Sequence, residues 1–183
     1  MTNRDDVPSY SIPLEARAQI GIKLAVAWDG QWFLKVCDKF GWGIASEINV
    51  RVRPSFSRME MRATLRALGK RKANDLADAL AVWQAYMNQI FGFDSDAFES
   101  EQVIKGDTIH VTFTKCAVME GAKRAKLEHT EQACIGCAAA WGPWFGALLP
   151  DYEVSDEIIA QMGYGAPQCQ IRVRAVPRNA PED

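Results

Sequence analysis

Apolar and polar positions in the first half of the chain alternate with the period of a helix, in which apolar residues recur every three to four positions. Five such segments follow one another, at residues 13–29, 31–40, 44–51, 60–68 and 74–91. Asp29-Gly30 interrupts the first pattern and Pro54 ends the third, so we expect separate helices at these points. The apolar residues of 13–29 predict a largely buried helix.

The pattern changes after Phe93, where apolar and polar residues begin to alternate with the period of a strand. Four segments predict strands in two hairpins, 97–104 with 107–115 and 152–161 with 168–176. Between the hairpins, residues 117–126 predict a short helix and residues 130–150 predict a long apolar one. Gly163 and Gly165 fall in the loop of the second hairpin and predict a turn.

These elements predict an α+β domain in which a helical N-terminal half packs on an antiparallel sheet of about four strands. The two hairpins supply the strands, and the apolar helix is expected to lie buried beneath them. A chain of 183 residues can bury one sizeable core. We therefore expect a single domain over residues 13–176, with flexible tails at 1–12 and 177–183.

The run from Ala133 to Pro150 contains no charged residue, and its length approaches that of a membrane span. It also contains two cysteines, three glycines and Pro143, which would leave backbone groups without partners in lipid. We interpret the run as a buried core helix rather than a membrane segment.

The net charge of the chain disfavours two classes of binding partner. A formal net charge of −2 gives no long-range attraction for nucleic acid or for an anionic membrane, so we expect neither as a partner. The polar N-terminus, Met1 to Asp6, is not followed by an apolar signal core, which predicts a cytoplasmic protein. A small-molecule ligand is the expected partner, and a homodimer is left open.

Several familiar catalytic arrangements are absent from the sequence. The two histidines, His110 and His129, lie beside no nucleophile motif of the Gly-x-Ser-x-Gly kind, which disfavours a serine hydrolase. There is no phosphate-binding glycine loop and no dinucleotide fingerprint.

Four of the five cysteines fall between residues 116 and 169. Cys134 and Cys137 share one face of a predicted helix near its N-terminus, where the helix dipole is expected to lower a thiol pKa. Cys116 ends one predicted strand and Cys169 begins another, so a compact fold is able to bring all four together.

Three interpretations of these cysteines stay open. The four thiols, or three of them with Glu120 as an oxygen ligand, predict a zinc site, and four sulfur ligands would equally suit an iron–sulfur cluster. A Cys-x-x-Cys pair is also typical of thiol–disulfide chemistry. Finally, each cysteine is consistent with a small buried core residue.

A second candidate feature is an aromatic ligand pocket. Six tryptophans are many for this length. Trp141, Trp144 and Phe145 continue the helical stripe begun by Cys137, and Trp32 and Trp83 from the first half are expected to join them around a small apolar or heterocyclic ligand. The alternative is that these side chains are ordinary core.

Several short motifs resemble one known family. They are Asp29-Gly-Gln-Trp-Phe-Leu-Lys-Val, Lys39-Phe-Gly-Trp, Val111-Thr-Phe-Thr-Lys-Cys116 and Gly165-Ala-Pro-Gln-Cys169. On these motifs the chain, from about residue 20 to 175, resembles the L-2-amino-thiazoline-4-carboxylic acid hydrolase-like proteins. More distantly it is similar to small-molecule-binding domains of the vinyl-reductase type, in which cysteines and a glutamate can hold a structural zinc.

The resemblance implies a metal- or thiol-dependent hydrolase that opens a C–N or C–S bond of a small heterocycle. In such an enzyme Glu120 would be the base and Cys134 the candidate nucleophile, while Cys116, Cys134, Cys137 and Cys169 would bind the metal. The alternative function is a non-enzymatic binding or sensor domain with a structural zinc or iron–sulfur site.

Overall fold

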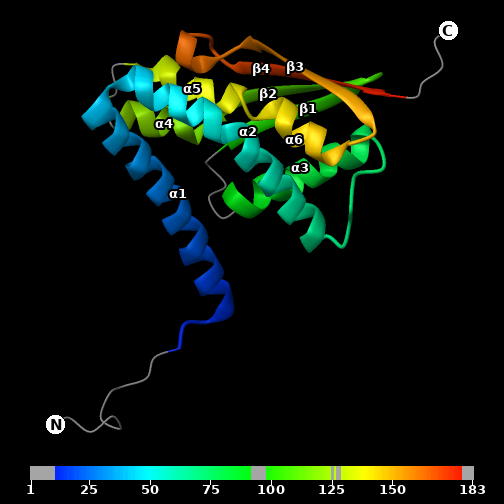
Figure 1. The fold of residues 1–183 in the computed structure, drawn as a ribbon, viewed down its shortest axis with the longest axis horizontal. Helices are drawn as coiled ribbons and strands as arrows, with labels where there is room; N and C mark the ends of the chain where they lie inside the picture. Colours follow the sequence, from blue (N-terminus) through cyan, green and yellow to red (C-terminus); the bar gives the residue numbers. More distant parts are fainter. Residues whose placement is uncertain (1–10, 92–97, 125, 127–128, 179–183) are drawn as a thin grey trace, which may run out of the picture.

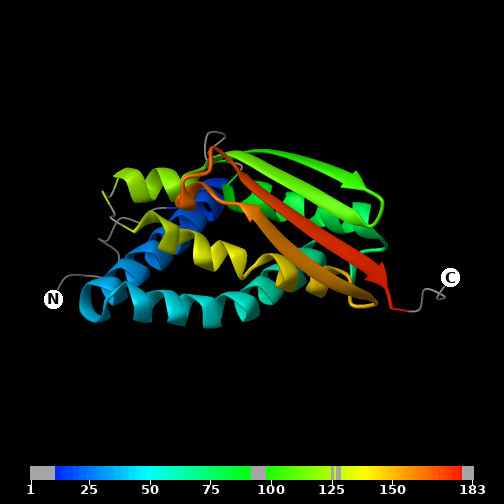
Figure 2. The same ribbon diagram turned by 90° about the horizontal axis from the view of Figure 1, so that it is seen from above.

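The structure of the protein is a computed structural model, which describes residues 11–91, 98–124, 126 and 129–178. It has one layer of antiparallel strands, with helices against one face of it (Figures 1 and 2). The α+β class predicted from the sequence is confirmed, with helices first and strands mostly later along the chain. Of the predicted flexible tails, residues 1–10 and 179–183 lie outside the described residues, as does residue 97 of the first predicted strand.

Three long helices form the first half. They are α1 (Leu14–Phe40), α2 (Trp42–Ala67) and α3 (Leu76–Phe91). Helix α2 packs on the helices that follow the first hairpin, and α3 contacts the sheet. Helix α1 contacts α2 near their shared corner and then extends away from the rest of the molecule as an arm (Figure 1).

Two predicted helix breaks are wrong. Helix α1 continues through Asp29-Gly30 and ends only at Gly41, whose φ of 82° is a left-handed conformation that glycine adopts readily. Helix α2 continues through Pro54, although proline inside a helix costs about 3 kcal/mol. We attribute this to tertiary packing, because buried residues of α2 on both sides of Pro54 hold it against the same body.

The sheet contains four strands in the order β1-β2-β4-β3. Their bounds are β1 (Phe98–Lys105), β2 (Thr108–Cys116), β3 (Tyr152–Ala160) and β4 (Cys169–Pro177). The two predicted hairpins are confirmed, and β2 also pairs with β4, with Phe113 opposite Cys169. Alternate residues of β2 and β4, such as Val111 and Ile171, are buried against the helices.

Three short helices lie between the hairpins, α4 (Ala117–Arg124), α5 (Thr130–Ala138) and α6 (Trp141–Leu148). The single apolar helix predicted over 130–150 is therefore wrong, since α5 and α6 are separate. Pro143 falls in the first turn of α6, where its missing N–H costs little. Asp156 of β3 accepts a hydrogen bond from the backbone N–H of Gly142, and a Cβ at Gly142 would lie 2.5 Å from its Oδ1.

The core lies between the sheet and helices α2, α3 and α6. Helix α1 lies outside it: the whole helix is described, and none of its residues is buried. The prediction of a largely buried helix over 13–29 is wrong, because nothing in the described chain covers this arm beyond its corner with α2. Among the described helices, none is both long and apolar enough to cross a membrane.

Candidate functional site

The four cysteines of the second half lie together at one end of the sheet. Cys116 ends β2, Cys169 begins the paired strand β4, and Cys134 and Cys137 come from α5. They lie close enough that a negative charge on Cys116 or Cys169 disfavours ionisation of both α5 thiols. All five cysteines of the chain are free.

Backbone N–H groups point at three of these sulfurs. The Met162 N–H donates to Cys169 Sγ at 3.3 Å, and the Gly163 N–H donates to Cys134. At the start of α4 the N–H groups of residues 118 and 119 donate to Cys116. The turn Met162–Tyr164 therefore lies directly against α5, and the left-handed Gly165 confirms the turn predicted for this loop.

Burial decides the charge state of these thiols. Desolvation raises the pKa of Cys116 and of Cys134 above the ordinary thiol value, even though backbone donors act in the opposite direction. It raises the pKa of Cys137 to about 12. The prediction that the helix dipole would lower the pKa of Cys134 and Cys137 is wrong, because loss of hydration outweighs the dipole of a nine-residue helix.

The donor groups do not fit a metal as the fold arranges them. Among the described residues, no group of three or more His, Cys, Asp or Glu side chains is arranged to hold a metal ion. Glu120 is partly exposed and pairs with Lys123 at 3.4 Å rather than with the thiols. The predicted zinc or iron–sulfur site thus finds no support here, and Cys134 is a buried neutral thiol that contacts Met119 Sδ at 3.7 Å.

Cys137 is an exposed residue, but desolvation of its sulfur strongly raises the pKa of the thiol. We expect iodoacetamide to alkylate it slowly at pH 7.5, because a pKa shifted from 9.0 to about 12 lowers the thiolate fraction roughly a thousandfold. The rate should rise tenfold per pH unit up to about pH 11, as followed by peptide mass spectrometry. The same peptide in urea is the control, and alkylation at equal rates in native and unfolded protein would contradict the desolvated environment.

The aromatic side chains form a compact cluster beside the thiols. Trp83 of α3 lies 5.2 Å from Trp141 and 6.3 Å from Trp144, measured between ring centroids. Trp141 stacks on Phe145 at 6.5 Å with an interplanar angle of 7°. Four of the five predicted pocket residues therefore meet in the core. The fifth, Trp32, does not, because it lies 61% exposed on α1.

Two tryptophans of this cluster have unused hydrogen-bond donors. In the described part of the chain, the indole N–H groups of Trp83 and Trp141 are buried without a hydrogen-bond partner. The Trp141 N–H approaches the Cys137 thiol and favours its thiolate, but without the geometry of a regular hydrogen bond. Buried donors are normally satisfied, so this pair is an unusual polar feature of the core, which it shares with the buried Ser57 hydroxyl.

Sequence reasoning missed a second polar cluster, on Glu60. Its carboxylate accepts hydrogen bonds from the Tyr86 hydroxyl at 2.5 Å, the Trp144 indole N–H at 2.6 Å and the Arg53 guanidinium at 2.8 Å. Burial, followed by the neighbouring Glu60 charge, raises the pKa of Tyr86. The cluster joins α2, α3 and α6 next to the aromatic cluster, and no sequence motif indicates it.

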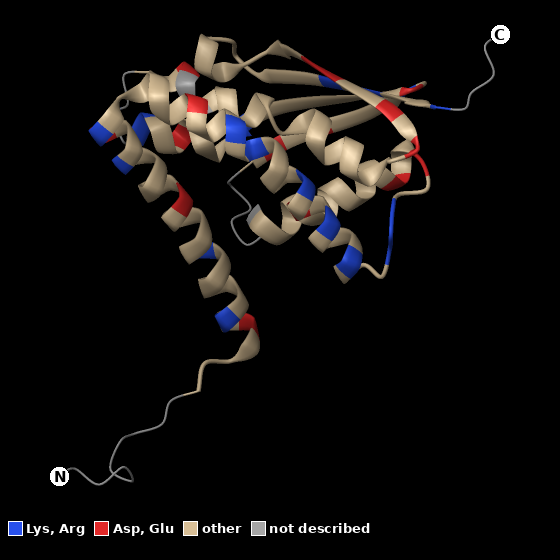
Figure 3. Ribbon diagram, in the orientation of Figure 1, with Lys and Arg blue, Asp and Glu red and all other residues tan. Residues whose placement is uncertain are grey.

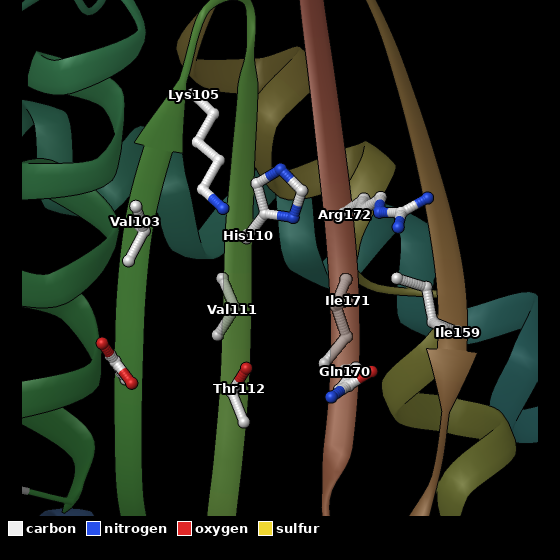
Figure 4. A pocket seen from close by; sticks show the side chains of 10 residues that line it. Val103, Lys105, His110, Val111, Thr112, Ile159, Gln170, Ile171 and Arg172 are labelled. Carbon is white, nitrogen blue, oxygen red and sulfur yellow. The ribbon is translucent and has the colours of Figure 1, made fainter.

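A shallow groove of about 260 Å³ lies on the other side of the sheet. Figure 4 shows Lys105, His110 and Arg172 directed into it from β1, β2 and β4. Arg172 also pairs with Glu157 at 3.3 Å. The groove shares no residue with the predicted site, and its open, mixed-charge lining distinguishes it from the enclosed aromatic cluster.

Comparison with known proteins shows the fold but no family. No family model and no curated protein matches the chain. The chain is similar to a crystal structure of trafficking protein particle complex subunit 3 from Naegleria fowleri covalently bound to palmitic acid, at 12% identity and a TM-score of 0.57, covering 88% of this chain and 99% of that one. A second similar structure is the phenol-responsive sensory domain of the transcription activator PoxR with phenol, at 10% identity and a TM-score of 0.49. The match covers 81% of this chain and 73% of that one.

Proposed function

We propose that this protein is a binding domain for a small amphiphilic molecule, one with an apolar body and a hydrogen-bond-accepting head. The observation that carries the proposal is the pair of buried indole N–H groups of Trp83 and Trp141, neither of which makes a regular hydrogen bond. A carboxylate or carbonyl head would satisfy these donors, and the surrounding rings would pack against the apolar body.

The thiols fit the same function. Because desolvation of their sulfurs keeps Cys116, Cys134 and Cys137 as neutral thiols, they provide an apolar, polarisable lining rather than nucleophiles. Cys137 is an exposed residue and lies next to Trp141, so it connects the aromatic cluster to the surface through α5. We therefore expect the ligand to enter beside Cys137.

The similar trafficking-complex subunit adds a chemical suggestion. It carries palmitic acid, a molecule with a long apolar chain and a carboxyl head. Fatty acids are accordingly the first ligand class to try. We expect reversible binding here instead of a covalent thioester, since raised thiol pKa values disfavour attack by sulfur. The hydrolase activity implied by the sequence resemblance stays a prediction.

The test titrates the purified protein with decanoate and palmitate below their micelle concentrations, and with phenol for comparison. We expect a saturable change in tryptophan emission and a rise in melting temperature, because a ligand that binds only the folded state stabilises it. Trp141→Phe keeps an aromatic ring but removes the donor, and should weaken binding about 5- to 30-fold.

The matched control is Trp28→Phe, which makes the same change at an exposed position on α1 and should leave binding unaltered. Intact mass after incubation should be unchanged, in keeping with reversible binding. Equal affinities of Trp141→Phe and the wild type, or no binding of any of these compounds, would refute the proposal.

A further inference from the structure

The α1 arm carries a row of exposed apolar side chains along one side. Ile20, Leu24, Trp28 and Trp32 are spaced by four residues and are between 46% and 73% exposed. Residues at this spacing stack along one ridge of a helix. Because the arm extends away from the body, the described part of its own chain leaves this ridge uncovered (Figure 1).

A second row with the same spacing lies on the first half of α2. Ile44, Ile48, Val52 and Phe56 are between 43% and 54% exposed. Beyond Phe56 this row is not continued, and the exposed residues of the second half of α2 include Arg58, Arg62 and Arg66. Figure 3 shows basic residues along this half of α2. The apolar row is therefore confined to the part of α2 near the corner with α1.

We propose that the two rows cover each other between two copies of this chain, with the α1 row of each copy packed on the α2 row of the other. Rows of residues four apart interdigitate in the commonest class of helix packing, with axes crossing near −50°. In a twofold dimer of this kind every copy must carry both contacting surfaces, here the α1 row and the α2 row, and this chain carries both. Helices α1 and α2 also match in length, with 27 and 26 residues.

The exposed area suits such a dimer. The chain, including the residues outside the described ranges, exposes 12311 Å², whereas a compact monomer of 20.4 kDa exposes about 8,800 Å². Helix α1, with no buried residue, accounts for part of that excess. A stable dimer covers about 800 Å² on each partner, of which Trp28 and Trp32 would supply roughly 200–350 Å². A net charge of only −2 opposes association weakly.

The test measures the mass of the full chain in solution by light scattering after size exclusion and by sedimentation velocity. We expect a dimer at micromolar concentration. Trp28→Glu on α1 and Ile48→Glu on α2 should each raise the dissociation constant at least about 100-fold, because each substitution is repeated across the twofold axis. Circular dichroism checks that the variants remain folded.

The matched control is Ile159→Glu on β3, since Ile159 and Ile48 are exposed to nearly the same extent, 42% and 43%. It should remain dimeric. The proposal would be overturned if the wild type were monomeric. It would also be overturned if Trp28→Glu or Ile48→Glu stayed dimeric, or if the Ile159→Glu control dissociated as readily as they do.

Mixing the two variants tests the reciprocal geometry. In a mixed dimer of Trp28→Glu with Ile48→Glu, one of the two contacts contains both substitutions and the other contains none. We therefore expect the mixture to form a heterodimer that neither variant forms alone. If the mixture stays monomeric, or if Ile48→Glu alone stays dimeric because α1 pairs with α1, the exchanged arrangement is wrong.

Discussion

Replacement of Glu60 by alanine is expected to lower the free energy of unfolding by about 3–5 kcal/mol, the range seen when one partner of a buried ion pair is removed. The substitution leaves three donors without their acceptor: the Arg53 guanidinium, the Tyr86 hydroxyl and the Trp144 indole N–H. Arg53 also lies 5.0 Å over the Trp144 ring, so its charge would stay in an aromatic environment. Urea unfolding followed by circular dichroism measures the loss.

Glu47→Ala provides the control for this change, since Glu47 lies on the same helix and its pair with Arg51 at 3.9 Å is solvent-exposed. Exposed pairs of this kind contribute at most about 1 kcal/mol. Glu60→Gln should fall between the two, because it retains one acceptor oxygen. A loss below about 1 kcal/mol in Glu60→Ala would show that the buried network does not hold the helices together.

The strands were the easiest part of the fold to predict. In β2 the residues Ile109, Val111 and Phe113 are buried and alternate with less buried neighbours, so a period of two is visible in the sequence. The helical segments were also recognisable by their period. Their boundaries were not predictable in the same way. The cost of Pro54 is overridden by the packing of α2, which only the folded chain reveals, whereas Gly30 costs only about 1 kcal/mol in a helix and does not end α1, which has no buried residue.

Exposure was harder to predict than secondary structure. An apolar row such as Ile20 to Trp32 indicates that something covers it, but its period is the same whether the cover is the chain's own core or another molecule. This ambiguity explains why Trp32 was placed in a ligand pocket and Trp28 in a buried helix. The structure puts both on the α1 arm.

The candidate site was predictable in position and not in chemistry. That Cys116 and Cys169 meet depends on the pairing of β2 with β4, which are not consecutive strands. The direction of the thiol pKa shifts depends on whether desolvation or the helix dipole is larger, and residue spacing contains no measure of burial. Glu60 had no motif at all, since Tyr86 and Trp144 come from distant parts of the sequence and only Arg53 lies on the same helix.

Gly163→Ala is expected to destabilise the protein by about 1–3 kcal/mol, because it forces atoms into a closely packed contact. A Cβ at this position would lie 2.5 Å from Cys134 Sγ, 2.9 Å from the Thr130 carbonyl oxygen and 3.1 Å from the Glu131 Cα. Two of these atoms belong to the backbone of α5 and cannot move as a side chain can. Thermal and urea unfolding measure the change in stability.

Gly146→Ala is the matched control for Gly163→Ala, because a Cβ there meets no atom within 4 Å and the residue lies within α6. In a helix the same substitution should stabilise by about 0.5–1 kcal/mol, which is the opposite sign. Repeating Gly163→Ala in a Cys134→Ala background removes the sulfur contact but leaves the Thr130 carbonyl. The stability cost of Gly163→Ala should therefore be smaller in this background, but not zero. If the coupling free energy between the two substitutions were near zero, the turn would not press on the Cys134 thiol.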